Sequence, residues 1–411
     1  MRIVIVGAGV AGCIMARALA RLPGMEVICL ERVARDDHSE SGTGLNVGPN
    51  AVQALQAHDA ELAAAITKAS FPWQSWKVSL TGGRTLFDLP LAHVANNDGW
   101  RIRWSELYRV LREMAPNIAY DCAITDAGPS PRNPAQSFIA WTQNGTQKRL
   151  DGIDLLIATD GRYSQMRRMF SGEPAIRHVG VAISRVLVPD TSGGLIDDYA
   201  QWFNGPNRLL AFRVPPAHVY VASAFPIAPG APLPDHFKDP DFLRDAFTPP
   251  DGTPGDQARW LIDTICAHVP DTHWARMQEH EVLYADPACN VLYLGDAAHG
   301  MVPTLGQGAT QAIEDAAFAA GLIARAAAEG RRNPRQWLQA IEAGRRERMH
   351  FVMEFSLAAT DTMLAGADPV AGTLHKTRPD FMAKLRRLYR DVQRPDAEPN
   401  DIDLSAGRLI A

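Results

Sequence analysis

The sequence predicts an α/β protein in which a parallel-sheet domain receives an inserted antiparallel-sheet domain and is followed by C-terminal helices. Residues 2–31 have the pattern of strand, Gly-rich turn, helix and strand, which is one βαβ unit. Residues 153–158 and 290–294 repeat the buried-strand pattern, and each runs into a turn that contains Gly and Asp. Between these two strands, short alternating or aromatic runs are separated by Pro and Gly, which favours an antiparallel sheet.

The individual elements follow from local pattern, taken in chain order. Residues 2–6 are apolar and mostly β-branched, as in a strand buried on both faces, and residues 11–22 have apolar positions at helical spacing. Residues 226–256 are dense in Pro, Asp and Gly, so we expect a loop with little regular structure. The inserted strands are expected at residues 178–188, 199–203, 208–214 and 218–225, and later helices at 309–329, 334–365 and 378–393.

These elements predict a discontinuous domain organisation. The nucleotide-binding domain is assigned to residues 1–75, 98–170 and 286–330. The substrate domain, an antiparallel sheet, takes residues 76–97 and 171–285, and a helical segment takes residues 331–411.

Composition excludes several classes of function. The net charge is -5 and no basic block is present, so nucleic-acid partners are not expected. No run approaches the roughly 20 apolar residues that span a bilayer, so no membrane partner is expected. The 5 cysteines are scattered without a C-x-x-C pair, which argues against a disulfide framework or a zinc site. Because no secretion signal is recognised at the N-terminus either, we expect a cytoplasmic protein without a metal.

The first motif is Gly7-Ala8-Gly9-Val10-Ala11-Gly12, between a strand and a helix. Gly7 permits the tight turn, Gly9 lets the backbone approach a pyrophosphate, and Gly12 allows close helix–strand packing. Glu31 ends the next strand, 19 residues after Gly12, where an acid can bind a ribose hydroxyl. The combination predicts a Rossmann-like dinucleotide site, although a purely structural turn and a solvated Glu31 are the alternative.

Two later segments decide which dinucleotide is expected. In residues 295–308, Asp296 follows a strand and can accept hydrogen bonds from a ribityl chain, while Gly306-Gln307-Gly308 opens a helix toward an anion. In residues 158–167, Asp160-Gly161 leaves another strand, and Arg167 can bind a phosphate or hold this loop to the nucleotide domain. A structural ion pair for Asp160 or Arg167 remains open.

The three motifs, in this order and at these separations, resemble the class A flavoprotein aromatic hydroxylases, which include p-hydroxybenzoate and salicylate hydroxylases. The likeness covers residues 2 to about 348. Residues 41–50 are similar to the family's G-x-G-[IL]-x-x-x-P-N segment, and Arg103 with Leu107 is similar to its R-x-x-L. The resemblance implies a Rossmann-like FAD-binding domain, with NAD(P)H bound without a domain of its own.

The resemblance also implies the reaction and the residues that contact the cofactor. NAD(P)H reduces FAD, and O2 then forms a flavin C4a-hydroperoxide beside Pro303. The hydroperoxide hydroxylates a small aromatic substrate, phenolic or heteroaromatic. We expect the enzyme to be a monomer or a homodimer. The residues carried over as FAD contacts are Gly7, Gly9, Ala11, Gly12, Glu31, Arg32, Gly44, Leu45, Arg103, Asp160, Asp296, Pro303, Gly306, Gln307, Gly308 and Ala309.

The substrate side is less determined. Asn46 stands where several relatives have a histidine, so a general base must come from elsewhere or be unnecessary. Besides Pro303, Arg213 and Tyr220 are the catalytic candidates, because Arg213 can pair with a carboxylate and Tyr220 carries a hydroxyl on a substrate-domain strand. The wider set is His178, Arg185, Tyr199, Gln201 and His218, whereas His299 is expected to make a structural hydrogen bond within its turn.

Alternative functions remain at this stage. A related flavin enzyme can catalyse epoxidation or N-hydroxylation of a non-aromatic substrate. A dehydrogenase that uses NAD without flavin leaves residues 295–308 unexplained, and a flavin-binding regulator without activity would show no substrate-stimulated NAD(P)H oxidation. Halogenation is disfavoured because Trp73 and Trp76 are not followed by the Ile-Pro of flavin halogenases.

Overall fold

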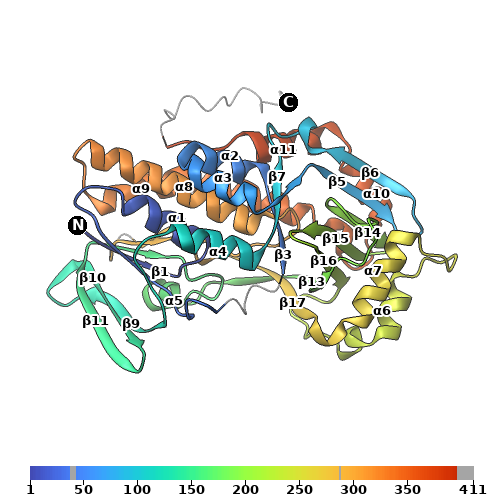
Figure 1. Ribbon diagram of the computed structural model, residues 1–411, viewed down its shortest axis with the longest axis horizontal. Helices are drawn as coiled ribbons and strands as arrows, with labels where there is room; N and C mark the ends of the chain where they lie inside the picture. Colours follow the sequence, from blue (N-terminus) through green and yellow to red (C-terminus); the bar gives the residue numbers. More distant parts are fainter. Residues whose placement is uncertain (38–42, 287, 396–411) are drawn as a thin grey trace.

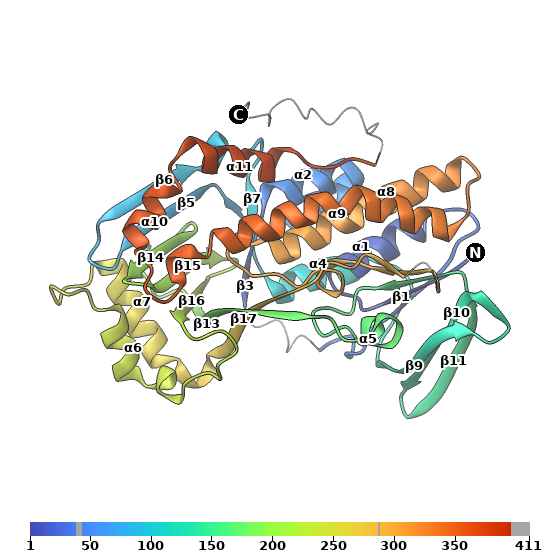
Figure 2. The same cartoon turned by 180° about the vertical axis from the view of Figure 1, so that it is seen from behind.

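The computed structural model describes residues 1–37, 43–286 and 288–395. Figures 1 and 2 show two connected halves, one carrying the N-terminal strand and the long helices, the other carrying most of the antiparallel strands. The mixed architecture with parallel and antiparallel sheets and C-terminal helices is confirmed. Within the described ranges, no helix combines the length and apolar character needed to cross a bilayer.

A six-stranded sheet forms the centre of the N-terminal half. Its order is β18-β19-β12-β1-β2-β8, with β18 antiparallel to β19 and the other neighbours parallel. Because both faces are covered, β1 and β12 are runs of buried apolar residues, as the sequence predicts. The strands are β1 (Arg2–Val6), β2 (Glu26–Leu30), β8 (Ile118–Ala119), β12 (Leu155–Ala158), β18 (Ala285–Asp286) and β19 (Val291–Tyr293).

Helices cover this sheet, and the long helix α8 packs directly against α1. Small residues such as Ala312, Ala316 and Ala319 are buried in α8, so the helix lies close to its neighbours. The helices of this half are α1 (Val10–Leu19), α2 (Pro49–His58), α3 (Ala60–Lys68), α4 (Trp104–Met114), α5 (Gln165–Ser171), α8 (Gln307–Ala328) and α9 (Pro334–Ala358).

A seven-stranded sheet forms the other half, in the order β17-β13-β16-β15-β14-β5-β6. It is antiparallel except between β14 and β5. One face packs toward the N-terminal half, and the other packs against α6 (Pro240–Phe247) and α7 (Asp256–Ala267). The strands are β5 (Ser75–Leu80), β6 (Thr85–Pro90), β13 (Ile176–Pro189), β14 (Ala200–Asn204), β15 (Asn207–Val214), β16 (His218–Pro226) and β17 (His273–His280).

The expectation of a loop with little regular structure at residues 226–256 is wrong. A 3-10 turn spans Asp235–Lys238 and α6 follows it. The start signals are present, since Asp239 accepts a hydrogen bond from the Asp241 backbone and Pro240 occupies the first turn. Phe237 and Phe247 then pack against Phe225 of β16, with ring centroids 4.8 and 5.3 Å away, so tertiary burial fixes a segment whose composition suggested a loop.

Two three-stranded sheets and the C-terminal helices complete the fold. A three-stranded sheet, β3-β7-β4, lies beside the seven-stranded sheet, and a second one, β11-β10-β9, extends from the N-terminal half. The C-terminal chain returns over the seven-stranded sheet. The elements are β3 (Gly44–Val47), β4 (Phe71–Trp73), β7 (Gly99–Arg103), β9 (Cys122–Ser130), β10 (Asn133–Gln143), β11 (Thr146–Ile153), α10 (Pro369–His375) and α11 (Pro379–Arg390), with 3-10 turns at Leu91–His93, Val269–Asp271, Gly295–Ala297 and Asp361–Met363.

Candidate active site

The three glycines of the first motif meet different surroundings. A Cβ at Gly12 would lie 1.9 Å from the Gly7 carbonyl oxygen, and one at Gly7 would lie 2.6 Å from the Thr159 carbonyl oxygen. Both glycines are therefore required by packing inside the protein. A Cβ at Gly9 would meet its nearest atom at 3.9 Å, so the protein itself leaves room there. Since Gly9 caps α1 without a side-chain hydrogen bond, the N–H groups of the first turn, where Ala11 lies, are available to a phosphate.

Glu31 lies at the end of β2 and is turned toward this loop. Its carboxylate accepts a 2.6 Å hydrogen bond from the Ala8 backbone N–H and one of 3.1 Å from the Val33 N–H. The Arg112 guanidinium lies 3.7 Å away. Glu31 is thus held beside the nucleotide loop, with carboxylate lone pairs left for a ribose hydroxyl. The neighbouring Arg32 is exposed at the same strand end.

Asp160 and Arg167 hold the turn after β12 in place. The Asp160 carboxylate accepts hydrogen bonds from Ser164 Oγ at 2.6 Å and from the Met166 N–H at 3.0 Å, and burial raises the pKa of this carboxyl. Arg167 donates to the carbonyl oxygens of Ala297 at 3.3 Å and Ala298 at 3.1 Å. Arg167 therefore connects the turn after β12 to the turn after β19, and Asp160 stabilises the turn after β12 itself.

The turn after β19 lies beside the first motif. A Cβ at Gly295 would be 3.0 Å from Ala312 of α8 and 3.9 Å from Ala11 of α1, so segments nearly three hundred residues apart meet here. Asp296 makes neither a hydrogen bond nor an ion pair with any residue the structure describes. Its Oδ1 lies 3.7 Å from a Cβ built at Gly308, in the first turn of α8. A half-buried, unpaired carboxylate between two helix N-termini suits the hydroxyls of a nucleotide ligand.

The start of α8 meets β3 and β7. Gly306 has a positive φ of 65° and caps α8 without a side chain, and a Cβ on it would lie 2.5 Å from Asn46 Nδ2. In β3, Gly44 pairs with Arg103 of β7, which brings the two supporting segments together. The Nε atom of Arg103 is buried without a hydrogen-bond partner among the described residues. A buried Nε of this kind favours an acceptor from outside the described residues.

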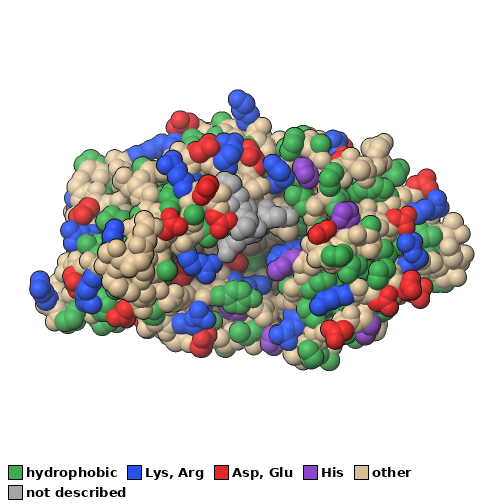
Figure 3. Space-filling model, turned by 60° about the horizontal axis from the view of Figure 1, so that its bottom comes forward, with side chains coloured by type: hydrophobic (Ala, Val, Ile, Leu, Met, Phe, Trp, Pro, Cys, Tyr) green, Lys and Arg blue, Asp and Glu red, His purple; other side chains and the backbone are tan. Residues whose placement is uncertain are grey.

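The remaining residues predicted to contact the cofactor lie around the start of α8 and in β3. Pro303 is exposed just before α8, and Gly308 and Ala309 are partly exposed in its first turn, whereas Gln307 is fully buried. Leu45 is half-buried beside Gly44. Figure 3 shows the surface hollowed between the two halves, with Lys, Arg and His side chains along the border of the hollow.

Comparison with known proteins fits this geometry. No protein-family profile matches the chain. A 3-amino-4-hydroxybenzoate 2-monooxygenase of Streptomyces cremeus is 27% identical over 338 residues, which is 79% of this chain and 78% of the relative. A salicylate hydroxylase of Pseudomonas putida is 29% identical over 90% of this chain and 88% of its own.

The chain is an FAD-dependent monooxygenase, similar in sequence to these aromatic hydroxylases. Its fold is similar to that of Klebsiella pneumoniae HpxO, whose structure was solved with FAD and uric acid, at a TM-score of 0.73 and 22% identity over 94% of this chain and 93% of that one. The uncapped helices, the open side of Gly9, and Asp296 and Arg103, which have no partner among the described residues, are groups of the kind that FAD would satisfy.

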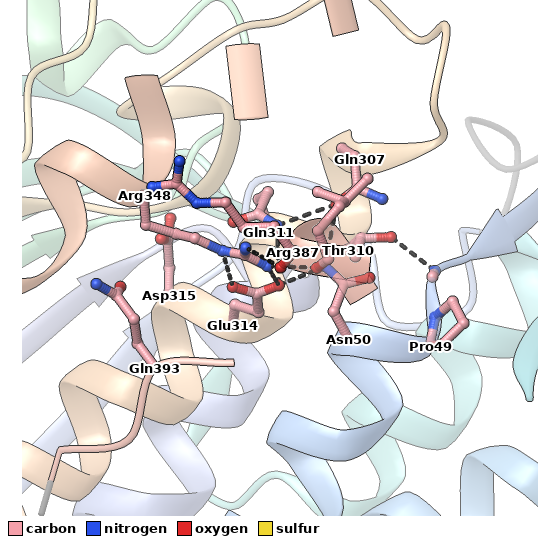
Figure 4. A network of polar contacts seen from close by, with 12 residues as sticks. Pro49, Asn50, Gln307, Thr310, Gln311, Glu314, Asp315, Arg348, Arg387 and Gln393 are labelled. Atoms are coloured by element: carbon pink, nitrogen blue, oxygen red, sulfur yellow. Dashed lines mark hydrogen bonds and ion pairs between the residues drawn. The ribbon is translucent and has the colours of Figure 1, made fainter. Parts of the chain in front are cut away.

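A buried polar network holds β3, α2 and the start of α8 together (Figure 4). Asn50 donates to Gln307 at 3.1 Å and also bonds Glu314, while the Gly48 N–H donates to Thr310 at 2.9 Å, so β3 and α2 are fixed to α8. Arg345 and Arg348 of α9 each lie 3.1 Å from Glu314. Burial alone would raise the pKa of Glu314, but the two guanidinium charges reverse this and hold it below its ordinary value.

Asp315 extends this network to the turn after β19. It accepts hydrogen bonds from the Gly295 N–H at 3.0 Å and Tyr284 at 2.9 Å, and it lies 2.6 Å from His299 Nε2. His299 thus has a structural contact, as expected, although its partner is on α8 and not within its own turn. The pKa of Asp315 lies below its ordinary value because His299 and Arg345 outweigh the effect of burial.

The substrate side of the site is a face of the seven-stranded sheet. Phe212 pairs with Tyr220 across β15 and β16, and both rings lie against Gly44, where an added Cβ would be 2.6 Å from Tyr220 Cβ. The Tyr220 hydroxyl makes no hydrogen bond with a described residue, whereas Tyr199 accepts one of 2.7 Å from Gln201. Burial raises the pKa of Tyr199 and of Tyr220, so both phenols are neutral near pH 7.

Arg213 lies on the other face of the seven-stranded sheet from Phe212 and Tyr220. Because side chains alternate along a strand, Arg213 faces away from Phe212 and Tyr220. Its Nε is 2.9 Å from Asp190, its guanidinium is 3.8 Å from Asp197, and its side chain is 33% exposed. Arg213 is therefore an ion-paired residue at a strand end, and the structure does not bring it to Tyr220.

Arg208 lies on the same sheet face as Phe212 and Tyr220, and it is absent from the candidates predicted from the sequence. It is 5% exposed, makes no hydrogen bond or ion pair with a described residue, and its Nε is buried without a partner. Burial lowers the pKa of Arg208, with the nearby Tyr199 and Tyr220 acting in the opposite direction. It lines a small cavity with Gln201, Thr304 and Lys376. The available signal was its strand parity, since residue 208 shares a face with residue 212.

The other candidates are spread around this face. Arg185 of β13 has a buried Nε without a partner, and its charge acts on Tyr220. The Nδ1 atom of His218 is buried without a partner, and burial together with Arg103 lowers the pKa of this imidazole. His178 lies at the far end of β13, near Gly230, and is not brought to the site.

Proposed function

We propose that this enzyme hydroxylates a small aromatic or heteroaromatic acid, using NAD(P)H and O2. The observation that supports the acidic group is Arg208, a buried cation without an acceptor next to Tyr199, Tyr220 and the loop before α8. A buried guanidinium without a partner is costly, and a substrate carboxylate would supply the missing charge and hydrogen bonds. The names of the relatives, hydroxybenzoate and salicylate enzymes, point to the same chemical class.

We further propose how the chain holds the cofactor. Gly7, Gly9, Ala11 and Gly12 with the α1 N-terminus take the pyrophosphate, Glu31 the ribose, and Asp296 the ribityl chain. The ring end lies near Gly44, Leu45, Arg103 and residues 303–309. Bound FAD, reduced by NAD(P)H, would activate O2, from which one oxygen atom goes to the substrate and the other leaves as water.

The substrate-side residues would then position the ring and exclude water. Arg208 fixes the carboxylate, and the Tyr220 phenol, neutral because its pKa is raised by burial, donates or accepts a hydrogen bond at a ring substituent. His218, neutral because its pKa is lowered, is the available proton acceptor on the same strand face. The apolar residues Phe212 and Leu210 keep this side of the flavin dry.

The domain division and the setting of the enzyme also remain proposals. We propose that residues 76–97 and 171–285 form the substrate domain, which the joining of β5 and β6 to the seven-stranded sheet supports. The free cysteines of the chain support a cytoplasmic enzyme, and we propose a monomer or homodimer.

Substrate-stimulated turnover tests the proposed function. Purified protein should be yellow and release FAD on denaturation, and hydroxylated aromatic acids should accelerate NAD(P)H oxidation with formation of a product one oxygen atom heavier. Colourless protein that takes up no FAD would refute the cofactor site. Turnover of aromatic amides at the same rate as the matching acids would refute the role of Arg208.

A further inference from the structure

A larger cavity lies on the opposite face of the seven-stranded sheet. It has a volume of about 340 Å³ and lies between β5, β6 and the start of α7. Strands β5 and β14 form a wall of both cavities, because their side chains alternate between the faces. Trp76, Gln201 and Phe203 line the active-site cavity, whereas Lys77, Ser79 and Trp202 line this one. The volume is within the range of small-ligand pockets.

Polar groups without partners line this second cavity. Thr81 is 1% exposed, and its Oγ1 has no hydrogen-bond partner in the part of the chain that the structure describes. Trp202 is also buried, and its indole N–H donates to no described residue. A buried hydroxyl without a partner is unfavourable, so its presence points to a ligand that supplies one.

The positive groups of the cavity come from one side chain and one helix. Lys77 has no ion pair with a described residue. Helix α7 begins at the cavity with Gly255 as its cap and without a side-chain capping bond. Gly255 donates to the Thr81 carbonyl and accepts from Arg259, which leaves the N–H groups of Asp256, Gln257 and Ala258 without backbone partners. These N–H groups and the helix dipole favour an anion.

Asp256 is the acidic residue of the lining and would oppose an anion. Its side chain is 78% exposed and lies 3.7 Å from Arg259. The carboxylate is therefore largely in water and partly neutralised, and solvent screens its effect on the interior of the cavity.

We propose that this cavity is a binding site, separate from the active site, for a small molecule that carries a phosphate or carboxylate group. The anionic group lies between Lys77 and the N-terminus of α7. The Thr81 hydroxyl, which has no partner among the described residues, donates a hydrogen bond to the ligand. The remainder of the ligand contacts the Trp202 ring. Because β5 and β14 also line the active-site cavity, a ligand here contacts the reverse side of the strand that carries Gln201.

Isothermal titration of the FAD-loaded enzyme with inorganic phosphate, and separately with benzoate, tests this proposal. We expect saturable binding of one or both probes, weakened at least about tenfold by Lys77→Gln and by Thr81→Val. Asp256→Asn should tighten binding by removing the opposing charge. The control Arg208→Gln lies on the other face of the sheet and should bind phosphate as the wild type does. Benzoate is an aromatic acid that Arg208 is proposed to hold in the active site, so its titrations are made in the Arg208→Gln background, where Lys77→Gln and Thr81→Val should still weaken binding.

Folding of each variant is monitored by Tm. Thr81→Val should not lower Tm, because it removes a buried hydroxyl that has no partner among the described residues. Absence of saturable binding of both probes, or equal affinity in wild type, Lys77→Gln and Thr81→Val, overturns the proposal. Loss of phosphate binding in Arg208→Gln together with full phosphate binding in Lys77→Gln also overturns it, because phosphate would then occupy the active site. None of these outcomes depends on the identity of the substrate.

Discussion

The two walls of the proposed active site offer ligands different kinds of groups. On the flavin side, backbone N–H groups at two uncapped helices and close glycine contacts form the surface, and side chains such as Arg167 serve mainly to tie loops together. On the proposed substrate side, the candidate binding groups are side chains that project from a sheet, among them Arg208, which has no partner in the described part of the chain. Backbone surfaces need specific residues at fixed spacing, whereas a sheet face can present many different side chains on one scaffold.

The largest effect is expected where backbone meets backbone on the flavin side. Gly12→Leu should abolish FAD retention, because even its Cβ would lie 1.9 Å from the Gly7 carbonyl oxygen. The matched control is Gly9→Ala, whose Cβ meets the protein only at 3.9 Å, so this variant should fold with unchanged Tm and yet lose FAD affinity. Flavin content and Tm are measured for both, and a normal flavin content in Gly12→Leu would contradict the assignment.

The substrate side is tested by Arg208→Gln. Loss of a buried charge-assisted pair should raise KM for an aromatic acid by about 10- to 100-fold, with FAD content unchanged. The corresponding amide should be affected little, because it lacks the charge that Arg208 binds. Arg213→Gln is the control and should leave KM nearly unchanged, since Arg213 pairs with Asp190. Equal effects of the two variants on the acid would remove the distinction between the two arginines.

A smaller effect is expected from Asp296→Asn. The carboxylate has no partner within the described residues and lies near the first turn of α8, so its charge is available to ribityl hydroxyls. Loss of charge-assisted hydrogen bonds should weaken FAD binding by about tenfold, measured by flavin fluorescence during dilution. Wild-type affinity in this variant would mean that Asp296 does not contact the cofactor.

The sequence predicted the two sides unequally, for physical reasons. The strand, turn and helix around Gly7 and the turn at Gly295 are local, and their spacing identifies them before folding. Arg208 and Arg213 lie five positions apart on one strand, and choosing between them requires the parity set by the pairing of Phe212 with Tyr220. The network around Glu314 was not anticipated, because its arginines lie on another helix, about thirty residues later in the chain.

The same network provides the mildest test, through pH. The pKa values of Glu314 and Asp315 lie below their ordinary values in the folded protein, because nearby arginines and His299 outweigh burial. For acids of this kind, the added stability is fully present above the unfolded-state pKa of about 4, and it is lost as pH falls below that value. FAD should therefore dissociate below about pH 4, as the pH approaches the lowered folded-state pKa values of Glu314 and Asp315 and the contacts of Asn50 and Gly295 with this network loosen. Arg348→Met should move the FAD release midpoint, followed by flavin fluorescence, to higher pH, because one of the charges that keeps Glu314 ionised is gone. An unchanged midpoint in that variant would mean that the release of FAD at low pH begins on the substrate side or in the nucleotide loop. The network around Glu314 would then not be what holds the flavin wall together.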